Sequence, residues 1–190
     1  MMFDNTVQEV MDKVNDLRHK VDDFWGVPAA EARFLAQLVR LGRSQSICEI
    51  GASYGYSTLH LAAAASEHGG HVHTIDIDQR KIDIVRSHLE QAGLYPFVTV
   101  HHGDAREVLA AMRAQSKFDF VFIDAVKDQC HSYLQAVWPL LASPAVIVTD
   151  NITTHAKELE GFVSYLRNHP SIRSCGVAVG NGIELSIHRQ

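Results

Sequence analysis

Residues 46–58, with the sequence SICEIGASYGYST, constrain the fold of this chain more than any other stretch. An apolar segment typical of a buried strand leads into a turn with two glycines, Gly51 and Gly55, and then into a helix. Glycine permits backbone angles or a close approach that a Cβ would prevent, and the start of a helix presents free N–H groups. We therefore expect the turn to hold a polar, anionic group of a ligand.

The spacing of this turn limits the kind of ligand. A dinucleotide-binding loop has the pattern GxGxxG, whereas here Gly51 and Gly55 flank Ser53 in place of the second glycine. About twenty residues further on, a second apolar segment ends in Asp76, where an acid can accept hydrogen bonds from both hydroxyls of a ribose. The two features together favour a nucleoside without a diphosphate, and S-adenosylmethionine (SAM) is the candidate because its amino-acid end carries a carboxylate.

The alternation of apolar and helical segments predicts an α/β fold with a doubly wound, mostly parallel sheet. The expected strands cover residues 46–51, 71–76, 98–103, 118–124 and 145–150, and the expected helices cover residues 29–41, 55–66, 79–92, 105–115, 129–141 and 155–168. The segments 172–179 and 183–188 are separated only by residues 180–182, so the sheet is expected to end in an antiparallel hairpin. With 190 residues, we expect one domain, residues 1–190, with residues 1–25 as an N-terminal helical extension.

The composition limits the classes of protein. The chain is 46% hydrophobic and 21% charged with a net charge of −5, which is unlike a disordered polymer and gives no support for nucleic-acid binding. No apolar run approaches the ~20 residues that span a bilayer, so no membrane association is expected. Three widely spaced cysteines argue against a disulfide framework. These features predict a soluble protein in the reducing cytoplasm.

The first helix, expected over residues 5–23, carries apolar residues at helical spacing among charges. Its apolar face runs from Val7 to Val21 and must be buried against something. We interpret this face as a reason to expect self-association as a homodimer.

Polar residues follow the expected strands at equivalent positions. In an open α/β sheet, ligands bind at the carboxyl ends of the strands. The residues at those ends are Glu49, Asp76, Asp104, Asp124, Asp150 and Asn151. Their shared position predicts a single functional site.

Five motifs in this order resemble one family. They are Glu49–Ser57, Thr74–Asp78, Gly103–Ala105, Phe118–Lys127 and Val148–Asn151. Over roughly residues 26–188, the chain resembles the class I SAM-dependent methyltransferases, and within them the cation-dependent O-methyltransferases that include catechol and caffeoyl-CoA O-methyltransferases.

The resemblance implies a cofactor site. It places Glu49, Gly51 and Ser57 around the methionine portion of SAM, with Ala52 in the same site. It also implies that Asp76 holds the ribose hydroxyls and that Asp104 and Ala105 lie against the adenine, through a carboxylate and a backbone N–H respectively.

The resemblance also implies a cation site and a candidate base. Asp124, Asp150 and Asn151 resemble the three protein ligands of a divalent cation, and Lys127 resembles the family's base. Carboxylate and amide oxygens suit Mg²⁺, with Mn²⁺ or Ca²⁺ as alternatives. A cation that lowers the pKa of a phenol makes vicinal hydroxyls a suitable acceptor. The expected activity is therefore methyl transfer from SAM to a hydroxyl of a small, catechol-like molecule.

Other interpretations stay open at this stage. Asp124 and Asp150 can be ordinary strand-end or turn residues, in which case the enzyme is a metal-independent methyltransferase. A non-catalytic SAM-binding protein and a doubly wound oxidoreductase are further alternatives, although the missing GxGxxG argues against the latter. Among the twelve histidines, the pairs 71/73 and 101/102 lack cysteine or carboxylate partners at zinc-ligand spacing, and only His155 lies near the expected site.

Overall fold

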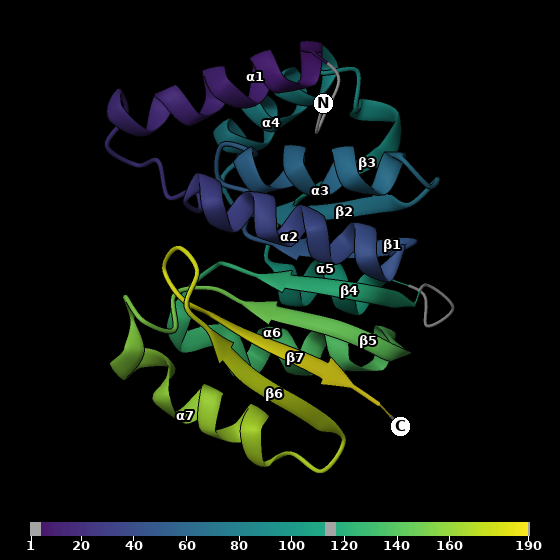
Figure 1. Ribbon diagram of the computed structural model, residues 1–190, viewed down its shortest axis with the longest axis vertical. Helices are drawn as coiled ribbons and strands as arrows, with labels where there is room; N and C mark the ends of the chain where they lie inside the picture. The colour runs from purple at the N-terminus through teal and green to yellow at the C-terminus, as the bar shows by residue number, and fades with distance from the viewer. Residues whose placement is uncertain (1–4, 113–116, 190) are drawn as a thin grey trace.

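The computed structural model describes residues 5–112 and 117–189, which form a seven-stranded sheet with helices on both faces (Figure 1). The strands follow one another in the spatial order β3-β2-β1-β4-β5-β7-β6. Their bounds are β1 Ser46–Ile50, β2 His71–Asp76, β3 Val98–His102, β4 Phe118–Ile123, β5 Leu141–Thr149, β6 Ile172–Val177 and β7 Ile183–His188. Strands β1–β5 are parallel, whereas β7 is antiparallel to both β5 and β6. The predicted doubly wound sheet with an antiparallel C-terminal hairpin is confirmed.

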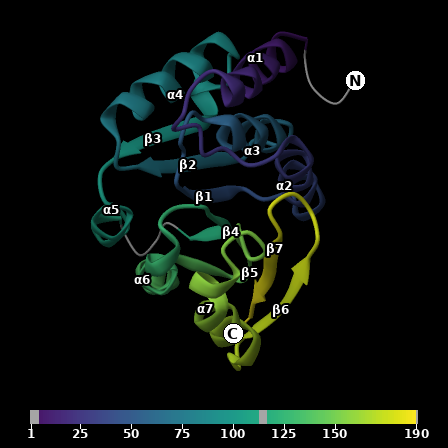
Figure 2. The same cartoon turned by 90° about the vertical axis from the view of Figure 1, so that its left-hand side faces the viewer.

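The helices form two layers, which Figure 2 shows from the side. Their bounds are α1 Asn5–Asp16, α2 Ala29–Gly42, α3 Tyr56–Ser66, α4 Gln79–Gln91, α5 Ala105–Ala111, α6 Cys130–Val137 and α7 Ala156–Asn168. Helices α1–α4 enclose one apolar core, and α5–α7 enclose a second core on the other face. The central strand β4 supplies both, since Phe120 and Phe122 belong to the first core and Val121 and Ile123 to the second. Burial on both faces explains why residues 120–123 of β4 are all apolar.

Helix α1 is shorter than predicted and its apolar face is covered within the chain. It ends at Asp16, where a 3₁₀ turn, Leu17–His19, replaces the expected continuation to residue 23. Val10, Met11 and Val14 are buried where α1 packs on α3 and α4. The apolar face therefore needs no second subunit, and the argument from this helix for a homodimer loses its basis.

Several other boundaries differ from the sequence expectation. Helix α6 ends at Val137, because the 3₁₀ turn Trp138–Leu140 leads directly into a longer β5 that begins at Leu141. Strand β6 ends at Val177 instead of residue 179. Helix α5 ends at Ala111, and part of the predicted continuation lies outside the described residues.

Within the described ranges, no helix combines the length and the apolar character needed to cross a lipid bilayer.

Candidate functional site

The carboxyl ends of the parallel strands surround a cavity of about 790 Å³. Most of the predicted site residues line it, namely Gly51, Asp76, Asp104, Ala105, Asp124, Lys127 and Asn151. The other four, Glu49, Ala52, Ser57 and Asp150, are buried and are not among the cavity-lining residues. The structure thus brings the predicted residues together at one edge of the sheet, as the topology requires.

The turn after β1 has the backbone conformation that its glycines predict. Gly51 and Gly55 have φ angles of 98° and 84°, and Ser53 between them has a φ of 47°. A methyl group at Gly51 would overlap the backbone of Asp124 at the end of β4, so only glycine fits. Gly55 immediately precedes α3, whose first N–H groups lack intrahelical partners.

Glu49 is fully buried below this turn and retains an unused oxygen. Its Oε2 accepts hydrogen bonds from the hydroxyls of Thr58 at 2.5 Å and Thr74 at 2.6 Å. Its Oε1 has no hydrogen-bond partner among the described residues. Burial raises the pKa of Glu49, although the nearby hydroxyls of Ser57, Thr58 and Thr74 oppose this shift. An orphaned carboxylate oxygen at this point suits a ligand that brings a positively charged donor, such as an α-ammonium group.

Asp76 holds the turn together from the end of β2. Its Oδ2 accepts the backbone N–H groups of Ala52 at 3.0 Å and Ser53 at 2.8 Å. Its Oδ1 accepts the N–H of Asp78 at 3.0 Å. Each carboxylate oxygen has more than one lone pair, so Asp76 can still accept bonds from a ligand in the cavity.

Asp104 is occupied in a way that the sequence did not reveal. It caps α5 by accepting the N–H of Arg106 at 2.8 Å, and the Arg106 guanidinium also binds the carboxylate, with Nε at 2.9 Å. These bonds to Arg106 lower the pKa of Asp104 to about 2. The carboxylate expected to contact adenine is therefore already paired, whereas the adjacent Ala105 lies in the first turn of α5.

Asp124 and Lys127 form an ion pair at the end of β4. Lys127 Nζ lies 2.7 Å from Asp124 Oδ1, and both side chains are largely buried. Burial and the nearby Asp150 raise the pKa of Asp124 to about 8, although Lys127 opposes this shift. The end of this strand thus places a carboxylate and an amine side by side at the cavity wall.

Asp150 and Asn151 follow β5 and are held by the loop of the last hairpin. Asp150 is 1% exposed, and it accepts hydrogen bonds from the N–H of Asn151 and from Asn181 Nδ2, the latter at 3.3 Å. Asn151 has a φ of 70°, in the left-handed region that asparagine tolerates better than most residues. Its Nδ2 donates to Thr154 Oγ1 at 3.1 Å, which orients the amide.

Glu31, near the start of α2, is a third acid in this region that the sequence did not indicate. It is fully buried, its Oε2 accepts the N–H of Asn181 at 3.0 Å, and its Oε1 has no partner in the part of the chain that the structure describes. Burial and the nearby Asp150 raise the pKa of Glu31 to about 9. An acid three residues after Pro28, in the first turn of a helix, is so common that its sequence position gave no signal.

These residues fit a hard divalent cation by their chemistry. Asp150 lies close enough to Glu31 and to Asp124 to raise the pKa of both of these carboxyl groups, an arrangement that a bound cation would relieve. Asn151 adds an amide oxygen at the cavity wall. No group of three histidine, cysteine or acidic side chains among the described residues is placed to hold a metal, so the fit rests on two carboxylates and one amide.

The strap that joins α1 to α2 crosses the same cavity and was missed by sequence reasoning. Asp23, Trp25 and Gly26 line the cavity. Tyr54 in the turn after β1 donates its hydroxyl to Asp23 Oδ1 at 2.7 Å, and Arg80 binds both of these residues. The strap has a mixed composition, with no motif and no periodic pattern. Its position at the cavity could therefore be seen only in the tertiary structure.

Trp25 is an exposed aromatic side chain of this strap. It is 73% exposed, and Lys81 Nζ lies 4.4 Å from the centre of its ring. The buried Lys81 side chain also donates to the carbonyl of Asp23 at 3.1 Å. A cation–π contact of this kind fixes one face of the indole.

Two of the histidines singled out in the sequence lie side by side. His73 Nδ1 and His101 Nε2 lie 3.1 Å apart on β2 and β3, so these two rings satisfy each other. His155 does line the main cavity, and its Nδ1 lies 3.2 Å from Thr154 Oγ1.

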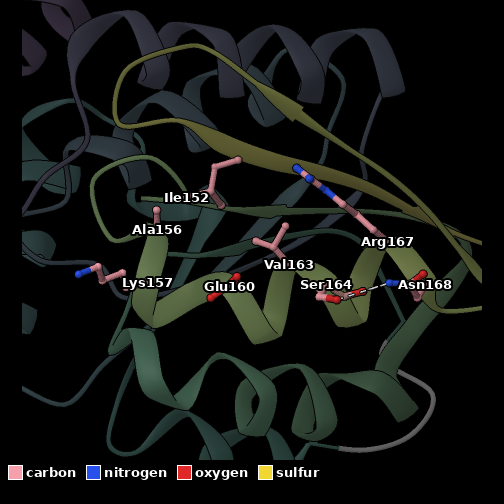
Figure 3. A pocket seen from close by; sticks show the side chains of 8 residues that line it. All are labelled: Ile152, Ala156, Lys157, Glu160, Val163, Ser164, Arg167 and Asn168. Carbon is pink, nitrogen blue, oxygen red and sulfur yellow. Dashed lines mark hydrogen bonds between the residues drawn. The ribbon is translucent and has the colours of Figure 1, made fainter.

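A second cavity of about 580 Å³ lies beside α7, as Figure 3 shows. It contains none of the predicted site residues. Arg167, on its wall, is held by Glu184 through Nε at 2.8 Å and Nη2 at 2.7 Å. Asn168 donates to the carbonyl of Ser164 at 2.8 Å within the same helix. Arg167 and Asn168 are therefore engaged with the hairpin and with their own helix, respectively.

Comparison with known proteins identifies the family. The O-methyltransferase family model matches residues 5–189, and the chain belongs to that family. The chain is 35% identical to a catechol O-methyltransferase of Mycobacterium tuberculosis over 126 residues, which are 66% of this chain and 56% of that protein. It is 30% identical to caffeoyl-CoA O-methyltransferase 2 of Petunia hybrida over 179 residues, which are 83% of this chain and 74% of that protein.

The fold agrees with this assignment. The O-methyltransferase of Bacillus cereus, whose crystal structure contains SAH, superposes with a TM-score of 0.83 at 26% identity, covering 98% of this chain and 91% of that one. The matches to the first two catechol O-methyltransferases, from Mycobacterium tuberculosis and Niastella koreensis, span 56% and 64% of the length of those proteins. The predicted membership of the catechol and caffeoyl-CoA group of SAM-dependent methyltransferases is confirmed.

Proposed function

We propose that this protein is a SAM-dependent O-methyltransferase that methylates a hydroxyl group of a small, catechol-like acceptor with the help of a divalent cation. One observation carries the proposal. A single cavity joins the glycine turn and Asp76 on one side to Asp124, Lys127 and Asn151 on the other. A cofactor and an acceptor bound there would meet between these two sides. The family assignment and the names of the relatives support the same reaction.

The residues around the turn suit the cofactor. The unused oxygen of Glu49 would accept a hydrogen bond from the ammonium group of SAM, and Ser57 at the start of α3 would bind its carboxylate. Asp76 would accept the ribose hydroxyls, and the backbone N–H of Ala105 would lie against the adenine. Bound SAM supplies a methyl group that its sulfonium makes electrophilic.

The opposite wall suits the cation and the acceptor. Asp124, Asp150 and Asn151 would hold Mg²⁺, or Mn²⁺ or Ca²⁺ in its place. A cation there lowers the pKa of an acceptor hydroxyl and fixes its orientation. Lys127, 2.7 Å from Asp124, would serve as the base for the acceptor hydroxyl. Transfer would form the bond from oxygen to the methyl carbon and break the bond from that carbon to sulfur. The hydroxyl proton would pass to Lys127 after its ammonium group, which pairs with Asp124 here, has lost its own proton to solvent.

Two alternatives are distinguished by experiment. In a metal-independent methyltransferase, Asp150 and Asn151 would only shape the pocket, and activity would survive complete chelation. A non-catalytic SAM-binding protein would bind SAM tightly without turnover. The test is methyl transfer from SAM to a panel of catechols, phenols and amines, in parallel with Mg²⁺ and with EDTA. Methylated catechol only with Mg²⁺ is the expected result; product with EDTA would contradict the role of the cation.

The assembly and the location of the protein are also proposals. The family resemblance favours a homodimer, and a monomer in sedimentation at micromolar concentration would contradict it. A reducing cytoplasmic location is supported by three free cysteines, Cys48, Cys130 and the exposed Cys175.

A further inference from the structure

The loop of the closing hairpin, residues 180–182, is packed tightly against the loop that carries Asp150 and Asn151. The carbonyl of Asn181 accepts the N–H of Thr153 at 3.1 Å, and the carbonyl of Gly182 accepts the N–H of Ile152 at 2.9 Å. A methyl group at Gly182 would overlap Thr153. The two loops therefore hold each other through backbone contacts, and Asn181 lies at the centre of the junction.

Asn181 stands between two buried carboxyl groups. Its backbone N–H donates to Glu31 Oε2 at 3.0 Å, and its side-chain Nδ2 donates to Asp150 Oδ2 at 3.3 Å. Glu31 is 0% exposed and Asp150 is 1% exposed. Across residues 5–112 and 117–189, neither acid forms an ion pair with lysine, arginine or histidine. Asn181 is thus a neutral donor that bonds to both.

Two features connect this cluster with the proposed cation site. Glu31 Oε1 is buried and receives no hydrogen bond from an N–H or O–H group of the described residues, and the Glu31 carboxyl lies beside the Asp150 carboxyl, which raises its pKa. Asn181 itself lines the main cavity together with Asp124 and Asn151. A buried carboxylate keeps a given orientation only if hydrogen bonds fix it, because rotation about its side-chain bonds would otherwise turn its oxygens away from the ligand position.

We propose that Asn181, anchored by Glu31, is a positioning residue that orients the Asp150 carboxylate for binding of the divalent cation. This inference rests on the proposed function, since it assigns a partner to one of the proposed cation ligands. Hydrogen-bond partners that orient metal ligands typically contribute 10- to 100-fold to metal affinity. Asn181 would act through Asp150 alone and would leave the cofactor side of the cavity unchanged.

The test compares Asn181→Ala with the wild type by titration calorimetry, using Mn²⁺ as the metal probe and SAH as the cofactor probe, and by the electron paramagnetic resonance spectrum of bound Mn²⁺. Asn181→Ala should weaken Mn²⁺ binding about 10- to 100-fold and alter the spectrum of the bound ion. The affinity for SAH should stay within about twofold of the wild-type value, because the loss of one distant hydrogen bond should not change the turn after β1. Asn168→Ala is the matched control, because the Asn168 side chain donates to Ser164 within its own helix α7, away from the proposed cation site.

The outcomes separate this inference from the proposed function. Wild-type Mn²⁺ affinity in Asn181→Ala would overturn the inference alone. Equal losses of Mn²⁺ and SAH binding would also overturn it, since they would show that the loop merely maintains the fold. If the alanine variant does not fold, Asn181→Ser, whose hydroxyl is too short to bridge to Asp150, carries the same expectation. Absence of Mn²⁺ binding by the wild type would instead overturn the cation role in the proposed function, and this inference with it.

Discussion

Gly51 is in direct contact with the backbone of Asp124, so the turn after β1 and the end of β4 are packed against each other without space for a side chain. The N–H of Asp124 also donates to the carbonyl of Ile50 at 2.9 Å, which fixes the two strand ends relative to each other. The proposed cofactor turn and the proposed cation ligand are therefore parts of one rigid edge. A substitution in the turn should therefore change the structure on both sides of the cavity.

Gly51→Ala should abolish measurable SAH binding. The added methyl group would overlap the Asp124 carbonyl, and the φ of 98° is unfavourable for alanine. Calorimetric titration with SAH checks this expectation. Gly69→Ala is the control, since Gly69 also has a positive φ, 79°, but its methyl group would meet no atom within 4 Å. The control should lose only about 1 kcal/mol of stability and should bind SAH normally.

Asp76→Ala should weaken SAH binding by roughly 1.5 to 3 kcal/mol for each charge-assisted hydrogen bond lost to the ribose. The loss includes an indirect part, because Asp76 also fixes the N–H groups of Ala52 and Ser53. Asp83→Ala, at an exposed position of α4, serves as the control. An unchanged affinity in Asp76→Ala would contradict the ribose assignment.

The sequence predicted the fold where its signals were local and repeated. The strand ends at Asp76, Asp124 and Asp150 were found because parallel strands place their carboxyl ends at one edge, whatever the details of packing. The dimer argument from α1 was weaker, because an apolar helix face shows that a partner is needed but not which one. In the fold, α3 and α4 cover Met11 and Val14.

The parts of the site that the sequence did not reveal depend on contacts between distant segments. Glu31 and Asn181 are separated by 150 positions, and no spacing rule connects them. Arg106 is only two residues from Asp104, with which it pairs. From the sequence alone, however, an arginine at this position can equally well extend into solvent. Such contacts require the tertiary structure.

Asp150→Ala should remove Mg²⁺-dependent turnover while SAH binding stays nearly intact, because Asp150 lies away from the cofactor turn and bonds Asn151 and Asn181. Activity with a catechol acceptor and calorimetric SAH affinity are measured on the same preparation. A parallel loss of both would mean that Asp150 is structural.

Lys127→Met should lower kcat by about 10²- to 10⁴-fold, the usual contribution of a general base. Methionine keeps the apolar stem but removes the amine that lies 2.7 Å from Asp124. Steady-state kinetics over a range of pH gives kcat and the KM for SAM separately. Should kcat stay within twofold of the wild-type value, Lys127 would not be the base.

Acid should destabilise the protein in a way that depends on His60. Burial, with smaller effects of Arg33 and Arg40, lowers the pKa of this histidine from 6.5 to about 4. Between pH 4 and pH 6.5, the histidine is therefore more protonated in the unfolded chain than in the folded protein. The contribution of His60 to the free energy of unfolding is complete above about pH 6.5 and falls as the pH drops toward 4. His60→Phe, which keeps an aromatic ring against Tyr56, should reduce the pH slope by up to about 1.4 kcal/mol per unit. Urea unfolding at pH 7, 6 and 5 (roughly the range where a histidine titrates) checks this, and equal slopes for the two proteins would contradict it.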